Sequence, residues 1–185
     1  DTTALSTRGP LNDTGGSRSA VGNTDYGWFS RGYPGTESKT QRIDYSSDTV
    51  IALEKGTTSL LAQAGAGNQF YGYFTGGYPS VSPASKKSVV ERLDFANDST
   101  ACAPKANLDV SRQWFAGTGN ANFGYHGGGS SGSPAACSRV DYSSDTVQAV
   151  SRAALTSPTD GTGATGNTSY GYFAPGGPGN RKSLI

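Results

Sequence analysis

Histidine is almost absent from this sequence of 185 residues, which contains only His126. A metal site or a catalytic triad requires several clustered partners, so a lone histidine supplies neither. Cysteine is also scarce, and Cys102 and Cys137 are too few to form a disulfide scaffold. The sequence leaves open whether these two thiols form a bridge between repeats or stay free and buried.

An excess of charge and long hydrophobic runs are also missing. The chain has 15 Lys and Arg against 14 Asp and Glu, a net charge of +1, which gives no reason to expect nucleic acid or an anionic membrane as partner. No apolar run approaches the roughly 18 residues that a membrane span needs, so we expect no membrane insertion. No signal peptide is recognisable, and the chain starts at Asp1 without Met, so we expect processing or a longer parent polypeptide.

Glycine, serine, threonine and tyrosine are what the chain has in abundance. There are 27 glycines, and aromatic residues make up 10% of the chain although hydrophobic residues reach only 34%. This composition is typical of many short strands joined by tight turns. The regular recurrence of the aromatic residues and the low net charge argue against disorder.

Four sequence markers recur in the same order along the chain. The first two are Gly-Asn pairs at 22–23, 67–68, 119–120 and 166–167, and aromatic-Gly-aromatic units at 26–28, 71–73, 123–125 and 170–172. The other two are Gly-containing steps at 31–32, 76–77, 128–129 and 175–176, and Arg-aliphatic-Asp units at 42–44, 92–94 and 139–141. Markers in ordered copies indicate tandem structural repeats.

One aspartate in each repeat measures the period. Asp1, Asp48, Asp98 and Asp145 follow one another at intervals of 47, 50 and 47 residues. A period of this length, with several strands in each unit, is typical of the blade of a β-propeller.

Each repeat contains four segments with β character, which we illustrate with examples from the first and second repeats. The expected strands are 60–65, 71–74, 88–93 and 49–53. We expect the Gly-Asn pairs to form tight turns because both residues tolerate positive φ. The segment from Asp44 to Asp48 should form a hairpin turn, because Asp and Ser side chains bond their own backbone. We expect almost no helix, since no window has a 3.6-residue apolar period over a helical length.

The predicted fold is all-β: a small propeller of four blades, each with four antiparallel strands. We treat residues 1–185 as a single domain with repeats at about 6–53, 54–103, 104–150 and 151–185 plus 1–5. Residues 1–5 match the last strand of a repeat and residues 183–185 match the end of the third strand. The N-terminal strand should therefore complete the C-terminal blade and close the ring. The alternatives are a segment of a larger propeller, or two chains that join to make more blades.

The order of the markers resembles the kelch repeat of galactose-oxidase-type propellers. The resemblance rests on Tyr73-Phe74-Thr75-Gly76-Gly77, on Arg92-Leu93-Asp94-Phe95 and on the stretch 108–112, and it covers essentially the whole chain. The Trp that the family has after the turn is absent, and its Gly-Gly pair is broken at 31–32 and 175–176. The resemblance implies a propeller, whereas the copper chemistry of galactose oxidase would need two histidines.

A narrower resemblance concerns the residue motifs of the repeats. Tyr-Gly-Tyr-Phe-x-Gly-Gly, combined with Arg-Ile-Asp-Tyr-Ser-x-Asp-Thr, is similar to repeat arrays in tail and structural proteins of marine bacteriophages, particularly cyanophages. It implies an appendage or decoration module of a virion that contacts the host.

The recurring charged residues are predicted to be structural. They are Arg42, Asp44, Asp48, Arg92, Asp94, Arg139, Asp141 and Asp145. A calcium loop needs six or more oxygen ligands, and each repeat offers two carboxylates, so a role in forming turns is favoured. We expect His126 to be a packed ring because it replaces the Phe of the other copies. No catalytic residue, metal or cofactor is predicted.

The connections between the second and third strands of each repeat vary in length, and they are where we expect binding. Variable loops on a rigid repeat usually carry recognition. The candidate residues are Tyr33, Tyr78, Lys86, Lys87 and Ser130. Tyrosine and hydroxyl groups suit carbohydrate. Asn12, Asn97 and Asn167 match the N-glycosylation pattern, which arises easily in such a chain and leaves their modification open.

These observations favour a non-enzymatic structural and binding module of a virion or extracellular assembly. Its expected partners are other structural proteins of the assembly or a cell-surface glycan, and association into oligomers is left open. A secreted lectin-like propeller that binds glycans is the first alternative. A glycan-active enzyme is the second, but it should show carboxylates converging on one face. Fold alone does not decide among them.

Overall fold

The computed structural model describes residues 6–33, 38–79, 85–130, 135–158, 160–174 and 176. Over these ranges the protein contains three four-stranded antiparallel sheets and one two-stranded antiparallel sheet. The only helical elements in them are three short 3-10 turns. The predicted all-β class is confirmed.

The strands of each sheet follow one another in chain order. The first sheet contains β1 (Ala20–Gly22), β2 (Tyr26–Phe29), β3 (Lys39–Asp44) and β4 (Leu53–Thr57). The second contains β5 (Ala64–Gly67), β6 (Tyr71–Thr75), β7 (Val89–Asp94) and β8 (Ala103–Asn107). The third contains β9 (Ala116–Gly119), β10 (Phe123–Gly127), β11 (Cys137–Asp141) and β12 (Val150–Arg152), and the fourth β13 (Gly163–Gly166) and β14 (Gly171–Ala174).

The turn after the third strand of each complete sheet is a 3-10 turn. These turns are η1 (Tyr45–Ser47), η2 (Phe95–Asn97) and η3 (Tyr142–Ser144). The predicted strand at 49–53 was wrong, because the turn continues past η1 and β4 begins only at Leu53. The N–H of Val50 donates to the carbonyl of Ser47 at 3.4 Å, which keeps residue 50 out of the sheet.

The Gly-Asn turns form for a different reason from the one predicted. Neither residue of these pairs has a positive φ. Instead, the Asn23 side-chain oxygen accepts the N–H groups of Asp25 and Tyr26 at 2.9 and 3.0 Å, and the same pattern repeats in the other three sheets. Asn therefore closes the turn with its side chain. The turn also needs a glycine at position 22, because an added Cβ would lie 2.8 Å from the carbonyl oxygen of Tyr26 and clash with it.

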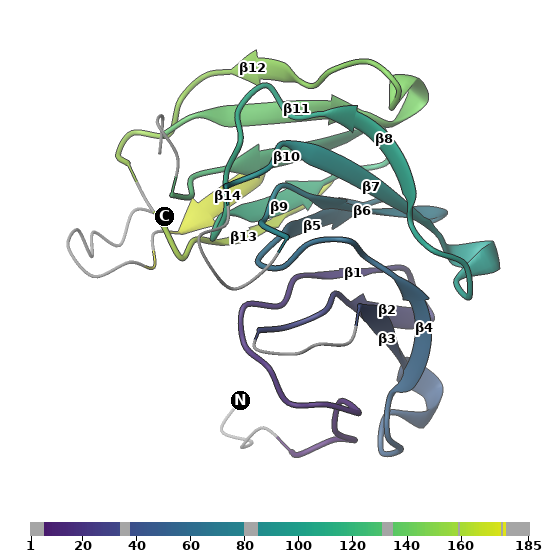
Figure 1. Cartoon of the computed structure of the whole chain (residues 1–185). Helices are drawn as coiled ribbons and strands as arrows, with labels where there is room; N and C mark the ends of the chain where they lie inside the picture. The colour runs from purple at the N-terminus through teal and green to yellow at the C-terminus, as the bar shows by residue number, and fades with distance from the viewer. Residues whose placement is uncertain are drawn as a thin grey trace.

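The first strand of each sheet lies beside the first strand of the next sheet. β1 contacts β5, β5 contacts β9, and β9 contacts β13. Figure 1 shows the sheets arranged as a fan, in sequence order, around these strands. Glycines permit the close approach: a Cβ on Gly65 would lie 2.2 Å from the oxygen of Ala20, and one on Gly117 would lie 2.4 Å from the oxygen of Gly65. The arrangement is propeller-like.

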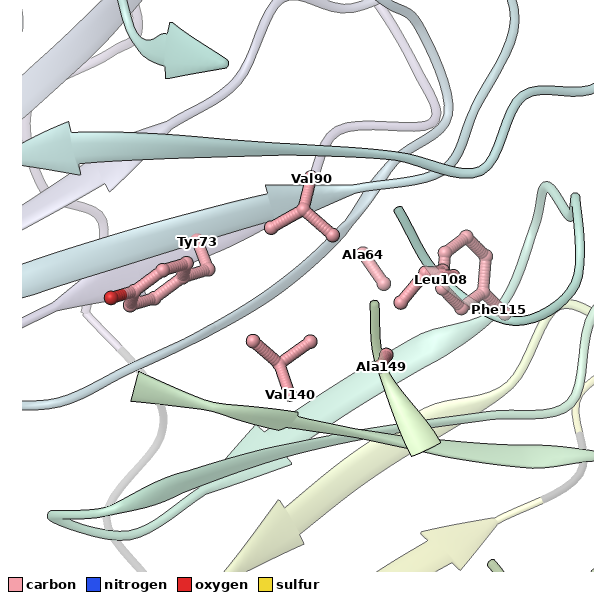
Figure 2. Close-up of a cluster of buried hydrophobic side chains, with 7 residues drawn as sticks. All are labelled: Ala64, Tyr73, Val90, Leu108, Phe115, Val140 and Ala149. Atoms are coloured by element: carbon pink, nitrogen blue, oxygen red, sulfur yellow. The ribbon is translucent and has the colours of Figure 1, made fainter. Parts of the chain in front are cut away.

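The hydrophobic core lies between neighbouring sheets rather than within one. Between the second and third sheets, one cluster consists of Ala64, Tyr73, Val90, Leu108, Phe115, Val140 and Ala149 (Figure 2). Between the first and second sheets, another consists of Val21, Trp28, Phe74, Leu93 and Cys102. Each sheet thus depends on its neighbour for burial of its apolar face.

The segment before the first sheet packs on that sheet as β4 packs on the second. The N–H of Gly9 donates to the carbonyl of Asp48 at 2.6 Å, and that of Gly56 in β4 donates to the carbonyl of Asp98 at 2.7 Å. Arg8 Nε lies 3.2 Å from Asp48, as Lys55 Nζ lies 3.3 Å from Asp98. Residues 8–10 therefore occupy, relative to the first sheet, the place of the last strand of a preceding sheet.

Candidate functional site

The junction between the first and second sheets is built around Asp98. This carboxylate, 7% exposed, accepts hydrogen bonds from Trp28 Nε1 and Arg42 Nη1, each at 2.9 Å. Lys55 Nζ approaches its other oxygen at 3.3 Å. All three donors belong to the first sheet and the carboxylate to the second. A buried carboxylate with this many charged and neutral donors is satisfied, so the arrangement locks the two sheets together.

The junction between the second and third sheets repeats this arrangement around Asp145. The Tyr73 hydroxyl donates to Asp145 at 3.0 Å and Arg92 Nη1 donates at 2.8 Å, while Lys105 Nζ lies at 3.5 Å. The pKa of Tyr73 is raised, because burial and the Asp145 charge both disfavour a phenolate. The recurring Arg and Asp at these positions thus act between sheets.

Aromatic rings complete both junctions. Trp28 stacks on Phe95 with ring centroids 4.2 Å apart, and Tyr73 stacks on Tyr142 at 4.5 Å. In each pair the second ring comes from the 3-10 turn of the following sheet. The guanidinium of Arg42 lies 4.3 Å from the ring centroid of Tyr26 in the neighbouring strand, which orients it toward the junction.

The first aspartate of each turn, unlike the second, acts locally. Asp44, Asp94 and Asp141 each accept the backbone N–H two residues later, at 2.9 to 3.0 Å. The Ser46 hydroxyl and N–H hold the pKa of Asp44 below its ordinary value. Among the residues that the structure describes, no group of three or more His, Cys, Asp or Glu side chains could hold a metal ion.

Besides the first aspartates of the turns, two of the predicted structural residues lack the arrangement seen at the two junctions. Asp48 is 37% exposed and pairs with Arg8. The Arg139 guanidinium lies 4.3 Å from the ring centroid of Phe123, and no carboxylate within the described ranges pairs with it. Asp48 belongs to the first sheet and Arg139 to the third. In the described part of the chain, neither of them faces a complete four-stranded sheet.

His126 lies in β10 and is completely buried. Its Nδ1 is 3.0 Å from Thr75 Oγ1, and its Nε2 has no partner among the described residues. Burial, together with the charge of nearby Arg112, lowers the pKa of His126 to about 3. The ring is therefore neutral at ordinary pH, and its Nδ1 faces a hydroxyl group rather than a carboxylate.

A hollow opens at the end of the sheets opposite the 3-10 turns. It has a volume of about 580 Å³, and residues from all four sheets line it. The lining residues are Ser17, Arg18, Ala62, Gln63, Trp114, Phe115, Asp160, Gly161, Thr162 and Gly176. All of them except Gly176, which follows β14, lie just before the first strand of a sheet, so equivalent segments of the four repeats surround a common space.

One backbone feature recurs around the hollow. Ser17, Ala62, Trp114 and Gly161 each lie five residues before the Gly of a Gly-Asn pair and have φ between 53° and 56°. Three of them are small, as a left-handed residue usually is. Trp114 is large and 44% exposed. Sequence reasoning missed it, although aligning the repeats on Gly-Asn puts one Trp against three small residues.

The polar groups of the hollow differ in how well they are satisfied. Arg18 pairs with Asp13 and donates to the carbonyl of Ser30 at 2.9 Å. Gln63 is buried, and its Nε2 donates to Glu91 at 2.9 Å, but its Oε1 has no partner within the described ranges. The hollow thus presents the exposed indole of Trp114 with its cation already neutralised, while the unpartnered Gln63 Oε1 is itself buried.

The predicted binding residues lie at the same end as the hollow. Isolated bridges pair Tyr33 with Gly16, Tyr78 with Leu61, and Ser130 with Gln113, directly before the positive-φ residues. Burial and the nearby Tyr33 raise the pKa of Tyr78. None of the predicted five is among the described residues that line the hollow.

Two further predicted binding residues, Lys86 and Lys87, lie in a segment whose backbone is hydrogen-bonded to neighbouring segments. The N–H of Lys87 donates to the carbonyl of Gly77 at 2.8 Å, and both Lys86 and Lys87 are half-buried. The carbonyl of Lys87 accepts the N–H of Arg112 at 3.2 Å, which ties this connection to the segment that leads to Trp114.

Both cysteines are free and buried, so the structure contains no bridge between Cys102 and Cys137. Burial raises the pKa of the Cys102 thiol to about 12. Of the three asparagines with a glycosylation pattern, Asn167 closes a Gly-Asn turn, Asn97 ends η2, and the Asn12 amide donates to Glu54 at 2.9 Å.

The observations define an all-β repeat protein with a propeller-like arrangement of sheets. No family model matches the chain, and no curated protein matches it. Among the described residues, no helix has the length and apolar character required to cross a membrane.

Proposed function

We propose that this chain is a non-enzymatic structural and binding module of a virion or extracellular assembly. The observation that carries the proposal is the use of ionisable residues at the junctions. Asp98 and Asp145 are buried and bonded between sheets, and His126 is buried and neutral. Residues with catalytic chemistry thus serve to make the repeat array rigid, and rigidity is what an assembly component requires.

We further propose that four blades close into a ring, with the N-terminal segment completing the fourth blade. The contact of Arg8 with Asp48 supports this, because it reproduces the contact of Lys55 with Asp98. The lining of the hollow by all four repeats supports it too. Residues 1–5 and 177–185, on which the predicted closing strands fall, lie outside the described residues.

The test of the assembly role is fractionation of the source culture with an antibody against the chain. A structural component should band with purified particles in a density gradient and resist removal by a wash at about 1 M salt, roughly seven times physiological ionic strength. Recovery only as soluble protein would contradict the assembly role. Release of reducing ends from a polysaccharide panel by the purified chain would contradict its non-enzymatic character.

A second candidate function, glycan binding, is favoured by the hollow around Trp114. An exposed indole face attracts the partially positive C–H groups of a sugar ring, and the carboxylate of Asp160, which lines the hollow, offers an acceptor for hydroxyl groups. Because Arg18 is neutralised by Asp13, a neutral saccharide suits the hollow better than an anionic one.

The test of glycan binding is an array of neutral and acidic oligosaccharides probed with the chain and with Trp114→Ala. Ala62 holds the equivalent backbone position, so Ala is tolerated there. Loss of binding by at least about tenfold is expected on removal of the indole. Phe70→Ala is the matched control, since Phe70 is exposed and does not line the hollow. No binding above background, or equal binding by Trp114→Ala, would remove this candidate and leave the assembly role standing.

A further inference from the structure

Two buried polar atoms lie close together beside Gly124, at the junction of the second and third sheets. A Cβ on Gly124 would lie 2.7 Å from the hydroxyl oxygen of Tyr142 and 3.1 Å from Nε2 of His126. Both atoms are buried, and neither has a hydrogen-bond partner among the described residues. An unpaired buried donor or acceptor is destabilising, so two such atoms near one point are natural partners for each other.

The opposite side of the imidazole ring indicates which nitrogen carries the proton. The Thr75 hydroxyl lies 3.0 Å from His126 Nδ1, and it donates its single proton to the carbonyl of Ala64 at 3.3 Å. The Thr75 oxygen is therefore an acceptor for Nδ1–H. In a neutral imidazole with its proton on Nδ1, Nε2 is an acceptor. The Tyr142 hydroxyl is the donor that this acceptor requires.

The third sheet is the one complete sheet that combines an imidazole with a buried hydroxyl at these two positions. The second sheet has Phe74 and Phe95 there, and the first has Phe29 and Tyr45. Phenylalanine has no polar side-chain atom, and Tyr45 is 52% exposed. In the complete sheets, buried polar atoms at these positions therefore occur together or not at all, which indicates that they act as a pair.

The groups around the ring oppose a positive charge on it. Arg112 is fully buried and donates to the backbone carbonyl of His126 at 3.2 Å, while Asp109 lies 3.9 Å from Arg112. Cys137 in β11 contacts the His126 backbone, and burial raises the pKa of both Cys137 and Tyr142, so these two groups stay neutral. Burial and the Arg112 charge accordingly lower the pKa of His126. A proton on the ring would add a second buried cation beside Arg112.

We propose that Thr75, His126 and Tyr142 form one hydrogen-bonded chain that acts as an acid-sensitive latch, a contact that holds the second and third sheets together only while the ring is neutral. In the neutral ring, Nδ1–H donates to Thr75 in β6, and Nε2 accepts the Tyr142 O–H directly or through one buried water. Uptake of a proton from solvent puts a hydrogen on both nitrogens, so Nε2 can no longer accept. An open junction, in which the ring reaches water, is then favoured. The latch goes beyond the assembly role and is independent of any ligand in the hollow.

The first experiment is nitrogen NMR of the imidazole ring in the isotopically labelled chain. His126 is the only histidine, so its ring signals need no further assignment. At about pH 7 we expect a protonated Nδ1 and an unprotonated Nε2. Tyr142→Phe should shift the Nε2 signal, because the hydrogen bond to this nitrogen is lost. A proton on Nε2, or an Nε2 signal that is the same in Tyr142→Phe, would overturn the hydrogen-bonded chain.

The second experiment measures urea unfolding of His126→Phe, Tyr142→Phe and the double variant. Each single variant should raise the equilibrium constant of unfolding at least about fivefold, because it leaves one buried polar atom unpaired. The double variant reproduces the Phe pair of the second sheet. Its increase should therefore be at least about fivefold smaller than the product of the two single increases. Increases that simply multiply would show that the two side chains do not interact.

The third experiment asks which junction opens in acid. Cys102 is buried in the cluster between the first and second sheets, and Ala149 is buried at the equivalent position between the second and third. Ala149→Cys therefore places a matched thiol at the second junction. Both thiols are labelled with dithiodipyridine, which reacts with thiols in acid, and the labelled peptides are quantified by mass spectrometry.

Between about pH 7 and about pH 4, labelling at position 149 should rise at least about tenfold relative to Cys102, since the open junction takes up a proton. Adding His126→Phe should abolish this relative rise, because its ring takes up no proton. An equal rise at both positions would mean that the whole chain unfolds. That result, an unchanged ratio, or a relative rise that persists in His126→Phe would overturn the latch.

Discussion

Two aspartates at the same repeat position, Asp98 and Asp48, show how surroundings decide what a residue contributes. Asp98 is buried under Trp28, Arg42 and Lys55, while Asp48 is about one-third exposed and meets Arg8. Removing one partner of a buried charge network leaves the others unpaired, which costs more than the loss of an exposed pair.

We therefore expect Asp98→Asn to lower the free energy of unfolding by about 3 kcal/mol, because Arg42 and Lys55 lose their counter-charge in a buried junction. Asp48→Asn, the matched control, should cost less than about 1 kcal/mol. Urea denaturation followed by tryptophan fluorescence measures both. Equal losses would mean that the junction at Asp98 is no stronger than a surface pair.

His126 should make the protein sensitive to acid. Its native pKa is lowered to about 3 by burial, below the ordinary value of 6.5, so between these pH values the unfolded chain binds a proton that the native protein does not. Stability from this group is complete above pH 6.5 and falls by about 1.4 kcal/mol per pH unit as the pH drops toward 3.

The variant that isolates this effect is His126→Phe, since Phe29, Phe74 and Phe173 hold the equivalent position. Its free energy of unfolding should depend less on pH than that of the original protein between pH 6.5 and 4, a range set by the lowered pKa. Guanidinium unfolding at several pH values measures the slope. Parallel curves for the two proteins would show that His126 does not control acid sensitivity.

Among the elements, the strands with a central glycine depend on close approach between sheets. In β6, a Cβ on Gly72 would lie 2.4 Å from a methyl of Val21 in the first sheet. Gly72→Ala should therefore lower the free energy of unfolding by about 2 kcal/mol, since the buried junction must shift. Gly163→Ala in β13 is the control, because its Cβ would meet no atom of the described residues within 4 Å. Thermal unfolding measures both variants. An equal decrease of Tm in the two would contradict the close approach of the first and second sheets at Gly72.

Elements with a strong local signal were predictable from sequence, and elements set by backbone hydrogen bonds were not. The expected strands at 71–74 and 88–93 nearly coincide with β6 and β7, because their glycine and Arg-aliphatic-Asp units fix the register. β4 was misplaced because Val50 and Ile51 look like strand residues, yet η1 extends the turn through them. Trp114 was missed because its hollow joins residues from four separate repeats.

At the scale of the whole molecule, exposure of apolar groups is uneven across the four sheets. Trp28 and Tyr73 are fully buried, whereas Tyr172, at the same position of the fourth sheet, is 49% exposed. Tyr45, which corresponds to the stacked Phe95, is 52% exposed. A repeat array that buries each sheet against its neighbour leaves two unpaired faces at its ends, and ring closure would bring Tyr172 against Tyr45.

Closure of the ring makes a coupling between distant residues measurable. If Tyr172 stacks on Tyr45, the double-mutant cycle of Tyr45→Ala and Tyr172→Ala should show an interaction of about 1 kcal/mol, as expected for a stacked aromatic pair. If the faces stay apart, the two losses should add, because separate exposed residues do not interact. Unfolding is measured at several protein concentrations, since pairing between two chains would make the coupling rise with concentration whereas closure within one chain would not. Additive losses at every concentration would mean that the first and fourth sheets do not meet, and that the propeller is completed by sheets from elsewhere.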